Sequence, residues 1–362
     1  MRIGVLGGGQ LGRMLALAGI PHGHEFVFLE PGGDAVRGLG ELIAASADDR
    51  SALERLAAEV DVVTYEFENV SLAAARSLAA RVPVLPPTEA LAVSQDRVVE
   101  KTFFRELAIP TARFAPVDAR AELDRAVAAL GLPAVLKTRR FGYDGKGQRV
   151  LRFPVDLSAA WAALGGTPLV LEALVPFSRE LSIVAVRGRD GAEAFYPLVE
   201  NHHHDGILRR TLAPAPGWTP ALQAIGEEHA RRVLERLRYV GVLAIELFQV
   251  GDELWANEMA PRVHNSGHWT IDGAATSQFE NHVRAIAGWP LGSTAVRGAV
   301  AMVNLIGTIP DPSAVLAVRG AHLHLYGKEP KRGRKVGHVT LVGESHAAMA
   351  DELAVVERLA AG

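Results

Sequence analysis

The first ninety or so residues alternate short apolar runs with amphipathic segments, and this alternation constrains the fold more than any other feature of the sequence. The runs RIGVLG, HEFVFLEP and VDVVTYEFE are predicted strands, and VPVLP at Val82–Pro86 is predicted as a fourth. The segments LGRMLALAGI and Arg50–Glu59 have the length and pattern of helices. Strands that alternate with helices at this spacing are typical of βαβ units. The N-terminal region is therefore predicted to be an α/β unit with a parallel sheet.

The rest of the chain follows a different pattern, so we expect more than one folded unit. A chain of 362 residues exceeds what a single hydrophobic core usually organises. The proline-rich stretch PVLPPTEAL predicts a boundary near residue 95. After it come the strand PAVLKT, a glycine-dense loop, the antiparallel pair ELSIVAVRG and AFYPLVEN, a helix at 220–238, the hairpin VLAIELFQV–GDE–LWANEM, and three short strands with a final helix.

The charge balance and the absence of cysteine exclude several classes of function. With 38 basic and 41 acidic residues the net charge is −3, so no overall field attracts nucleic acid or an anionic membrane. A cysteine count of 0 excludes disulfides, a thiol nucleophile and cysteine-ligated metal centres. No apolar run is long enough to span a membrane, and the chain opens as a strand rather than as a signal peptide. A cytoplasmic, soluble enzyme without nucleic-acid or membrane partners is therefore expected.

A first glycine loop, Gly7-Gly8-Gly9-Gln10-Leu11-Gly12, follows the first strand and opens the first helix. Together with Glu30 at the end of the second strand, it satisfies the fingerprint of dinucleotide-binding folds, in which backbone N–H groups and a helix N-terminus hold phosphate. The loop specifies a phosphate and not a dinucleotide, so a phosphorylated sugar would fit equally well. A nicotinamide dehydrogenase and an enzyme acting on a sugar phosphate both remain open on this motif alone.

A second glycine loop, FGYDGKGQ at Phe141–Gln148, joins two predicted strands with no helix after it. Its three glycines permit a tight, mobile hairpin whose amides can fold over phosphates. Lys137, on the strand before the loop, would place a fixed cation near the same phosphates. A loop tip without function is the alternative interpretation, but the neighbouring lysine favours nucleotide binding.

Two glutamates, Glu246 and Glu258, form the most informative pair in the sequence. A hairpin loop centred on Asp252 places them opposite one another on the same face. Glu246 lies in an apolar strand, where an unpaired buried carboxylate would be costly. Two converging carboxylates suit a Mg²⁺ that bridges nucleotide phosphates, whereas the alternative is an acidic surface hairpin. The polar run MAPRVHNSGH after Glu258 is too dense for a routine turn.

In this order, the motifs VLK, FGYDGKGQ, LEALVPFSRELS and the AIELF–NEMAPR hairpin resemble the ATP-grasp superfamily. Within it, GGGQLGRM, YEFENV, NHHHDGILRRT, NEMAPRVHNSGHWT and YGKEPKRGRKVGH resemble the family of 5-(carboxyamino)imidazole ribonucleotide synthases of purine biosynthesis, over essentially the whole chain. The resemblance implies an α/β fold with ATP-grasp architecture in four parts. These are a Rossmann-like pre-ATP-grasp domain at 1–95, a small lobe with the glycine-rich lid at 96–175, a catalytic lobe with the metal hairpin at 176–292, and a small β-rich C-terminal domain at 293–362.

The resemblance implies a ligase that uses ATP and bicarbonate to carboxylate 5-aminoimidazole ribonucleotide. Its products would be ADP, phosphate and 5-(carboxyamino)imidazole ribonucleotide, formed through carboxyphosphate. Mg²⁺ is the implied metal, with Mn²⁺ as a substitute, and a homodimer is the implied assembly. A sister ATP-grasp ligase acting on another acid or amine is the main alternative, because a fold does not fix a function. A nucleotide-binding regulatory protein is a further alternative. Such a protein would be expected to lack catalytic groups, but this sequence has them.

The resemblance also assigns site residues. ATP would be bound by two cations, the lid, the strand between the lobes and polar groups of the catalytic lobe: Arg97, Lys137, Gly142, Tyr143, Asp144, Gly145, Lys146, Gly147, Gln148, Glu172, Ala173, Leu174, Val175, Glu180, His203, Asn257 and Glu258. Among these, Glu172 would read the adenine edge and Glu180 would hold the ribose hydroxyls. The catalytic groups facing bicarbonate and the amine would be Tyr143, Asp144, Lys146, Arg262, His264 and Asn265. The ribonucleotide would be bound by Gly9, Gln10, Leu11, Lys328, Arg334 and Lys335 at its phosphate, with Glu66 or Glu68 near the aminoimidazole.

The metal would be held by Glu246 and Glu258. Ala260 stands where many ATP-grasp enzymes place an asparagine ligand, which leaves the number of metal ions open. The run His202-His203-His204 invites a zinc site as an alternative. Adjacent residues of an extended segment point in alternating directions, so three such histidines rarely share a metal.

Overall fold

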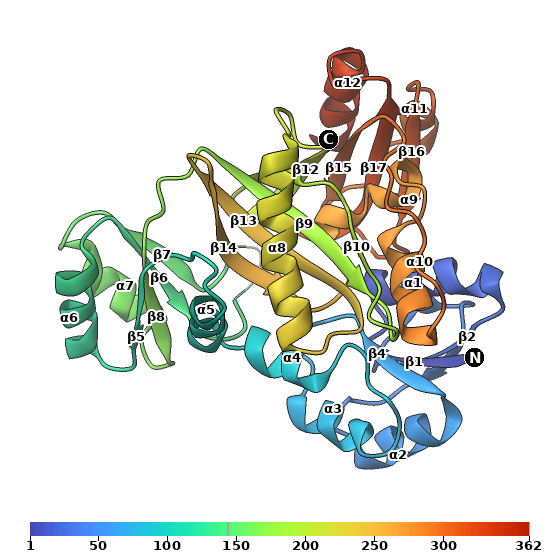
Figure 1. Ribbon diagram of the computed structural model, residues 1–362, viewed down its shortest axis with the longest axis horizontal. Helices are drawn as coiled ribbons and strands as arrows, with labels where there is room; N and C mark the ends of the chain where they lie inside the picture. Colours follow the sequence, from blue (N-terminus) through green and yellow to red (C-terminus); the bar gives the residue numbers. More distant parts are fainter. Residues whose placement is uncertain (143–144, 362) are drawn as a thin grey trace.

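The computed structural model describes residues 1–142 and 145–361, and it places the N-terminal residues in a parallel sheet with the order β3-β2-β1-β4. The strands are β1 (Arg2–Leu6), β2 (Glu25–Leu29), β3 (Glu41–Ile43) and β4 (Val62–Tyr65), and the helices among them are α1 (Gln10–Gly19), α2 (Arg50–Glu59) and α3 (Leu72–Ala79). This is the blue part of Figure 1. The predicted parallel α/β unit is therefore confirmed.

The fourth predicted strand, Val82–Pro86, is reduced to a parallel bridge beside β4. Val84 forms only an isolated bridge with Val63, because Pro83 and Pro86 have no amide to extend a ladder. The fourth strand of the sheet is instead β3, a short segment that the sequence pattern did not predict.

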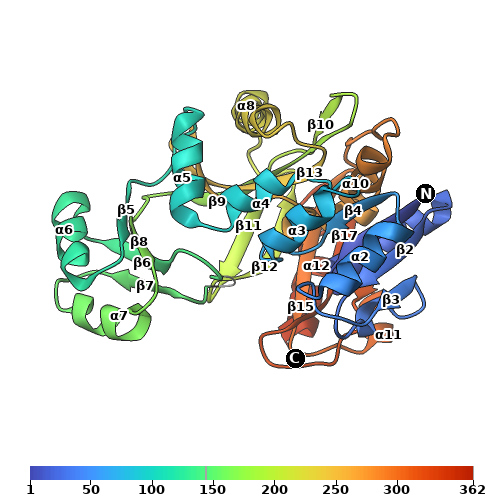
Figure 2. The same ribbon diagram turned by 90° about the horizontal axis from the view of Figure 1, so that it is seen from below.

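A second, antiparallel sheet forms the small lobe at one end of the molecule (Figures 1 and 2). Its order is β5-β8-β6-β7, with strands β5 (Phe114–Val117), β6 (Ala134–Thr138), β7 (Gln148–Leu151) and β8 (Leu169–Ala173). Helices α6 (Arg120–Leu130) and α7 (Asp156–Leu164) belong to the same lobe. The second glycine loop connects β6 to β7, so the predicted arrangement of strand, loop and strand is confirmed.

The largest sheet has nine strands and runs without interruption from the hairpin β13–β14 to the C-terminal strands. Its path is β14 (Glu253–Ala260), β13 (Gly241–Val250), β9 (Arg179–Arg187), β11 (Val199–His204), β12 (Ile207–Ala213), β15 (Ala299–Ile306), β17 (Lys335–Gly343) and β16 (Ala321–Leu325), with β10 (Glu193–Phe195) beside β9. Strands β12 and β15 pair across the predicted boundary at residue 293. The four-part division of the chain stays a prediction.

Helices connect and cover these sheets. They are α4 (Thr88–Ser94), α5 (Arg97–Glu106), α8 (Pro220–Arg236), α9 (Thr270–Gly273), α10 (Gln278–Ala287), α11 (Pro312–Leu316) and α12 (Ala350–Ala361), with 3₁₀ turns at Ile20–His22, Asp34–Val36 and Asn265–Gly267. Among the described residues, no helix combines the length and the apolar character that crossing a bilayer demands.

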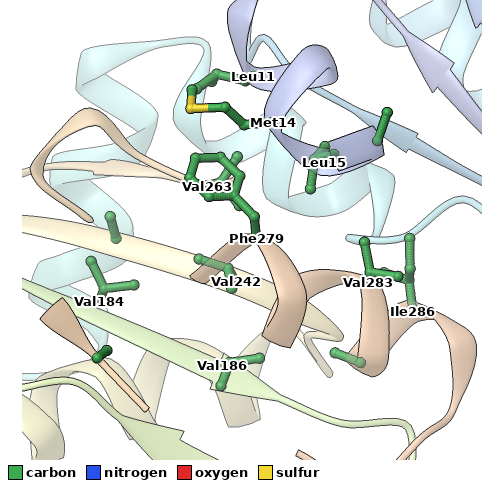
Figure 3. Packing of buried hydrophobic residues seen from close by; sticks show 14 of the residues in the cluster. Leu11, Met14, Leu15, Val184, Val186, Val242, Val263, Phe279, Val283 and Ile286 are labelled. Carbon is green, nitrogen blue, oxygen red and sulfur yellow. The ribbon is translucent and has the colours of Figure 1, made fainter. Parts of the chain in front are cut away.

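One apolar cluster joins the N-terminal unit to the large sheet. Figure 3 shows side chains of α1, α10 and strands β9 and β13 packed together, among them Leu11, Met14, Leu15, Val184, Val186, Val242, Phe279, Val283 and Ile286. A buried polar contact reinforces the joint: the His282 ring on α10 lies 2.9 Å from the Thr64 hydroxyl on β4. These contacts fix the N-terminal unit against the large sheet, and both units contribute to the cleft described below.

Candidate active site

A large cleft lies where the three sheets meet. Its volume is about 1260 Å³, and its walls come from the first glycine loop, the segment 66–70 after β4, α5, the small lobe, the hairpin β13–β14 and the segment 328–335. One drug-sized ligand typically occupies a pocket of roughly 300–1,000 Å³. The cleft is therefore large enough for more than one small molecule.

The predicted opposition of Glu246 and Glu258 is confirmed, and a β-bulge produces it. The two residues are direct partners in the antiparallel hairpin, and the register shifts between Glu246 and Leu247. Nearer the turn, Leu247 faces Ala256, so Asn257 is the extra residue of the bulge. Without this extra residue Glu246 would face Asn257, and the two carboxylates would not meet.

These two carboxylates differ in their protonation equilibria. Loss of solvation and the negative charge of Glu258 raise the pKa of Glu246 to about 7. Loss of solvation also acts on Glu258, but the charges of Arg97 and Lys137 outweigh it and lower its pKa to about 2. Arg97 donates to Glu258 over 2.6 Å.

The donor chemistry here fits a divalent cation. A cation between Glu246 and Glu258 would relieve their repulsion, and Mg²⁺ is usually held by one or two carboxylates plus phosphate oxygens. A third oxygen lies at the same bulge, on the Asn257 side chain. It is buried and has no hydrogen-bond partner among the described residues, so it is available to a cation. No group of three or more histidine or carboxylate side chains in 1–142 and 145–361 could hold a metal by itself.

A buried chain of charges lies behind the part of the cleft wall that contains Lys137. Lys137 on β6 lies 2.9 Å from the Glu172 carboxylate, and Lys101 on α5 approaches the same oxygen to 3.3 Å. Loss of solvation opposes ionisation of Glu172, yet the charges of the two lysines lower its pKa to about 2. Glu172 is only 3% exposed and does not line the cleft, and its carboxylate holds Lys137. Its contact with the adenine edge stays a prediction.

An apolar slot beside this wall was missed by sequence reasoning. Phe177 and Phe248 stack with ring centroids 4.5 Å apart, and both line the cleft together with Val135, Val150, Leu174 and Leu181. Of the predicted segment 172–175, only Leu174 reaches the cleft, whereas Ala173 and Val175 do not line it. The signal in the sequence was the apolar residue Phe177 directly after the interlobe strand.

Glu180 and His203 meet at the cleft wall from neighbouring strands, with the His203 Nδ1 bonded to the Glu180 carboxylate. Loss of solvation disfavours the protonated ring, but the bond to Glu180 outweighs it and raises the pKa of His203. The flanking histidines have other partners, since His202 pairs with Glu200 and His204 with Asp205. The three histidines are thus directed to three separate carboxylates.

The lid is described only in part, because Tyr143 and Asp144 lie outside the described residues. The Gly142 carbonyl accepts from Arg97, and Gly145, Lys146 and Gln148 line the cleft. A Cβ on Gly145 would lie 3.0 Å from the Asp205 carbonyl oxygen, so this part of the lid reaches the β11–β12 turn of the large sheet. Gly147 does not line the cleft; its backbone packs on Thr138, and its φ of 71° suits glycine.

The segment after the hairpin brings Arg262, His264 and Asn265 to the cleft. The Arg262 guanidinium pairs with Glu68, and the Asn265 amide exchanges two hydrogen bonds with Asn304 at 3.0 and 2.8 Å. Burial and the charge of Arg262 lower the pKa of His264 to about 3. Its Nδ1 accepts from the Ser266 amide, so Nε2 carries the hydrogen, 3.4 Å from Glu246.

The first glycine loop differs from the prediction at Gly9. Its N–H, predicted to bind the substrate phosphate, donates instead to the Glu66 carboxylate, as does the Gly12 N–H at 2.6 Å. The amides of Gln10 and Leu11 are in the first turn of α1, where no intrahelical partner exists. The Lys328 ammonium donates to the Gln10 side chain, so the predicted substrate residues do meet at this end of the cleft. Arg334 and Lys335 line the same wall.

Comparison with known proteins agrees with this architecture. Three family models match in sequence: a ribonucleotide synthetase preATP-grasp domain at residues 1–95, an ATP-grasp domain at 102–279, and a phosphoribosylaminoimidazole carboxylase C-terminal domain at 300–352. The N5-carboxyaminoimidazole ribonucleotide synthase of Pseudomonas aeruginosa is 56% identical, over 99% of each chain.

Solved structures show the same likeness. The N5-carboxyaminoimidazole ribonucleotide synthetase of Thermus thermophilus superposes with a TM-score of 0.95 at 57% identity, covering 99% of this chain and 98% of that one. The Aspergillus clavatus enzyme in complex with ADP and 5-aminoimidazole ribonucleotide has a TM-score of 0.89 at 31% identity, with 99% and 98% covered. The chain is therefore an ATP-grasp ligase and belongs to the family of N5-carboxyaminoimidazole ribonucleotide synthases.

Proposed function

We propose that this chain carries out the family reaction through carboxyphosphate: ATP, bicarbonate and 5-aminoimidazole ribonucleotide give ADP, phosphate and N5-carboxyaminoimidazole ribonucleotide. The observation that supports it best is a single cleft with the opposed carboxylates of the hairpin at one end and the first glycine loop with Lys328 at the other. The reaction moves a phosphoryl group from a nucleotide to bicarbonate and then a carboxyl group to a second phosphorylated molecule, so both molecules must be held in one cleft.

Bicarbonate is a poor electrophile because its charge is spread over its oxygens. Attack of a bicarbonate oxygen on the γ-phosphorus of ATP forms a new P–O bond and releases ADP. The amine of the ribonucleotide then bonds to the activated carbon, phosphate leaves, and the amine loses a proton. Carboxyphosphate hydrolyses where water enters, so the site must close during the reaction. The lid at 141–148 is the candidate for this closure.

At the nucleotide end, Arg97 and Lys137 would contact the phosphates beneath the lid. Stacked Phe177 and Phe248 would hold the adenine ring, and Glu180 with His203 would bind the ribose. Glu246, Glu258 and the Asn257 oxygen would hold Mg²⁺, which when bound neutralises charge on the phosphates during transfer.

At the other end, Arg262, His264 and Asn265 would bind the bicarbonate-derived anion. Arginine suits such an oxyanion because its fork can donate two parallel hydrogen bonds. The neutral His264 donates from Nε2 and takes up no proton near pH 7, since its pKa is about 3. Lys328, Arg334 and Lys335, with the amides of Gln10 and Leu11, would bind the ribonucleotide phosphate. Tyr143, Asp144 and Lys146 would face the amine.

The decisive measurement is ADP release from MgATP with bicarbonate, with and without 5-aminoimidazole ribonucleotide. Strong stimulation by the ribonucleotide and a labile carboxylated product are expected. ADP release that ignores the ribonucleotide but responds to another amine or acid would instead indicate a sister ligase of the same fold. Omission of magnesium with excess chelator should abolish ADP release in every case.

The proposal includes two features that derive from the family alone. The chain would work as a homodimer in the cytoplasm, where purine synthesis takes place. Light scattering on the purified protein at micromolar concentration would give the mass of the assembly directly, against 38.6 kDa for one chain.

A further inference from the structure

The anion site of the first glycine loop is already filled by the protein. In dinucleotide-binding folds this loop and the following helix N-terminus bind a ligand's phosphate. Here both carboxylate oxygens of Glu66 accept from the loop: one from the Gly9 amide and the other from the Gly12 amide. Glu66 comes from the end of β4, the strand that pairs with β1 directly before the loop.

The three glycines of the motif pack on this carboxylate. A Cβ on Gly7 would lie 2.5 Å from the Glu66 Cγ, and a Cβ on Gly9 would lie 2.7 Å from Oε1. At Gly12 the distance to Oε2 would be 3.3 Å, tighter than ordinary contact. The spacing G-x-G-x-x-G is thus accounted for by an internal side chain, without any bound pyrophosphate.

The carboxylate also adjoins the groups proposed to bind the substrate phosphate. Gln10 and Leu11 lie between Gly9 and Gly12, the two glycines whose amides donate to Glu66. Gly9, Gln10, Leu11 and Glu66 line the cleft, whereas Gly12 does not. Lys328 donates to the Gln10 side chain. Burial raises the pKa of Glu66, and the amides of Gly12 and Gly9 and the charge of Lys328 act against this increase. A shift of Glu66 would therefore move the loop, Gln10 and Lys328 together.

We propose that Glu66 is a positioning residue whose carboxylate permanently occupies the anion site of the glycine loop and orients Gln10 and Lys328 toward the phosphate of the ribonucleotide. The inference rests on the proposed function, and it replaces the predicted contact of Glu66 with the aminoimidazole. It also makes Glu66 a specificity determinant. A dinucleotide pyrophosphate would need the same two amides, so the protein excludes that class of ligand.

The test compares Glu66→Ala with Glu66→Gln in the ribonucleotide-stimulated release of ADP. Glu66→Ala should raise the KM for the ribonucleotide by about tenfold or more, because two charge-assisted hydrogen bonds are lost, and should leave the KM for ATP within about twofold. Acetate at millimolar concentration should restore most of the lost affinity in Glu66→Ala, since it carries the deleted carboxylate. It should not rescue Glu66→Gln, whose side chain fills the space but presents an NH₂ group to one of the amides.

Asp49→Asn is the matched control. Asp49 also accepts from two amides at a helix N-terminus of the same sheet domain, at 2.8 and 3.1 Å, but it does not line the cleft. Because asparagine caps a helix about as well as aspartate, this variant should change the melting temperature little and leave both KM values unchanged. Equal KM shifts in the two variants, or acetate that fails to rescue Glu66→Ala, would show that Glu66 only stabilises the fold and would overturn the inference. A wild-type protein that ignores the ribonucleotide would overturn the proposed function, and the role of Glu66 in binding with it.

Discussion

The charged side chains at the two ends of the cleft have different kinds of partner. At the end proposed to bind the nucleotide, which we call the nucleotide end, cations pair with carboxylates in the contacts Arg97–Glu258 and Lys137–Glu172, and Glu172 is buried. At the glycine-loop end, backbone amides hold the Glu66 carboxylate, and Lys328 donates to a neutral side chain. Under the proposed function, nucleotide phosphates would compete with internal carboxylates for their cations, whereas the ribonucleotide phosphate would meet a lysine that is hydrogen-bonded to the neutral side chain of Gln10. The two ends should therefore fail independently when each is altered.

The largest effect is expected for Glu258→Gln at the nucleotide end. The variant removes one of the two opposed carboxylates and leaves the Arg97 guanidinium without its anionic partner at 2.6 Å. ADP release should fall by roughly a thousandfold or more, because the proposed metal site and the cation geometry are lost together. The measurement is ADP release at saturating ATP and ribonucleotide.

Circular dichroism and the melting temperature serve as controls for this variant. Because Glu258 is 37% exposed on its side chain, we expect the fold to remain intact. Normal turnover in a well-folded Glu258→Gln protein would remove this residue from the metal site.

Glu172→Gln should weaken ATP binding without affecting ribonucleotide binding. It leaves the ammonium groups of Lys137 and Lys101 near a neutral amide in a buried setting, which typically costs about 3–5 kcal/mol of stability. The KM for ATP should rise by roughly tenfold because Lys137 is no longer held in place, while the KM for the ribonucleotide should stay within about twofold.

This variant also separates two roles of Glu172. If the residue read the adenine edge, the substitution would change the preference for ATP over GTP. If it only positions Lys137, both nucleotides should weaken by the same factor. A changed ATP-to-GTP ratio with normal stability would support the adenine contact predicted from the sequence.

Patterns between sequence neighbours predicted most of the fold and much of the site. The parallel N-terminal sheet, the hairpin with Glu246 opposite Glu258, and the lid between two strands all follow from local alternation and turn residues. The hairpin pairing was predicted from a loop centred on Asp252. The structure reaches the same pairing through a bulge at Asn257, which no pattern of apolar residues reveals.

Contacts between distant segments were the part that local reasoning missed. Gly9 and Glu66 are 57 positions apart, and their bond depends on the parallel register in which Leu6 pairs with Tyr65. Since that register places the two strand ends side by side, an acid directly after β4 was the available signal. Lys101 gave none, because a lysine on a helix is expected in solvent, and here it is 1% exposed.

The contact between the N-terminal unit and the large sheet should become less stable in acid. The His282 Nδ1 accepts from the Val242 amide on β13 at 3.1 Å, so its Nε2 donates to Thr64 on β4. Burial lowers the pKa of His282 from its ordinary value of 6.5 to about 3, so the folded state binds the proton less readily than the unfolded state. Its stabilisation is complete above pH 6.5 and is lost as the pH falls from 6.5 toward 3, which amounts to about 2 kcal/mol at pH 5.

Chemical denaturation at pH 7.5 and pH 5 would measure this loss. The wild type should lose about 2 kcal/mol more than His282→Gln over this interval. His204→Gln is the control, because the His204 side chain is 75% exposed and should leave the pH dependence unchanged. An identical pH dependence in wild type and His282→Gln would remove His282 from the joint.

The smallest effect is expected for Glu41→Gln, which repeats the geometry of Glu172 on the surface. The Glu41 carboxylate also lies between two cations, Arg2 at 2.8 Å and Arg55 at 2.5 Å. These side chains are 36–51% exposed, so water and salt screen the pairs, and the loss should stay within about 0.5 kcal/mol. Melting curves of Glu41→Gln and Glu172→Gln at the same ionic strength compare one arrangement of charges in two environments. A loss of stability in Glu41→Gln as large as that in Glu172→Gln would mean that burial does not set the energy of these pairs. The buried charges behind Lys137 would then have no special role in holding the nucleotide end.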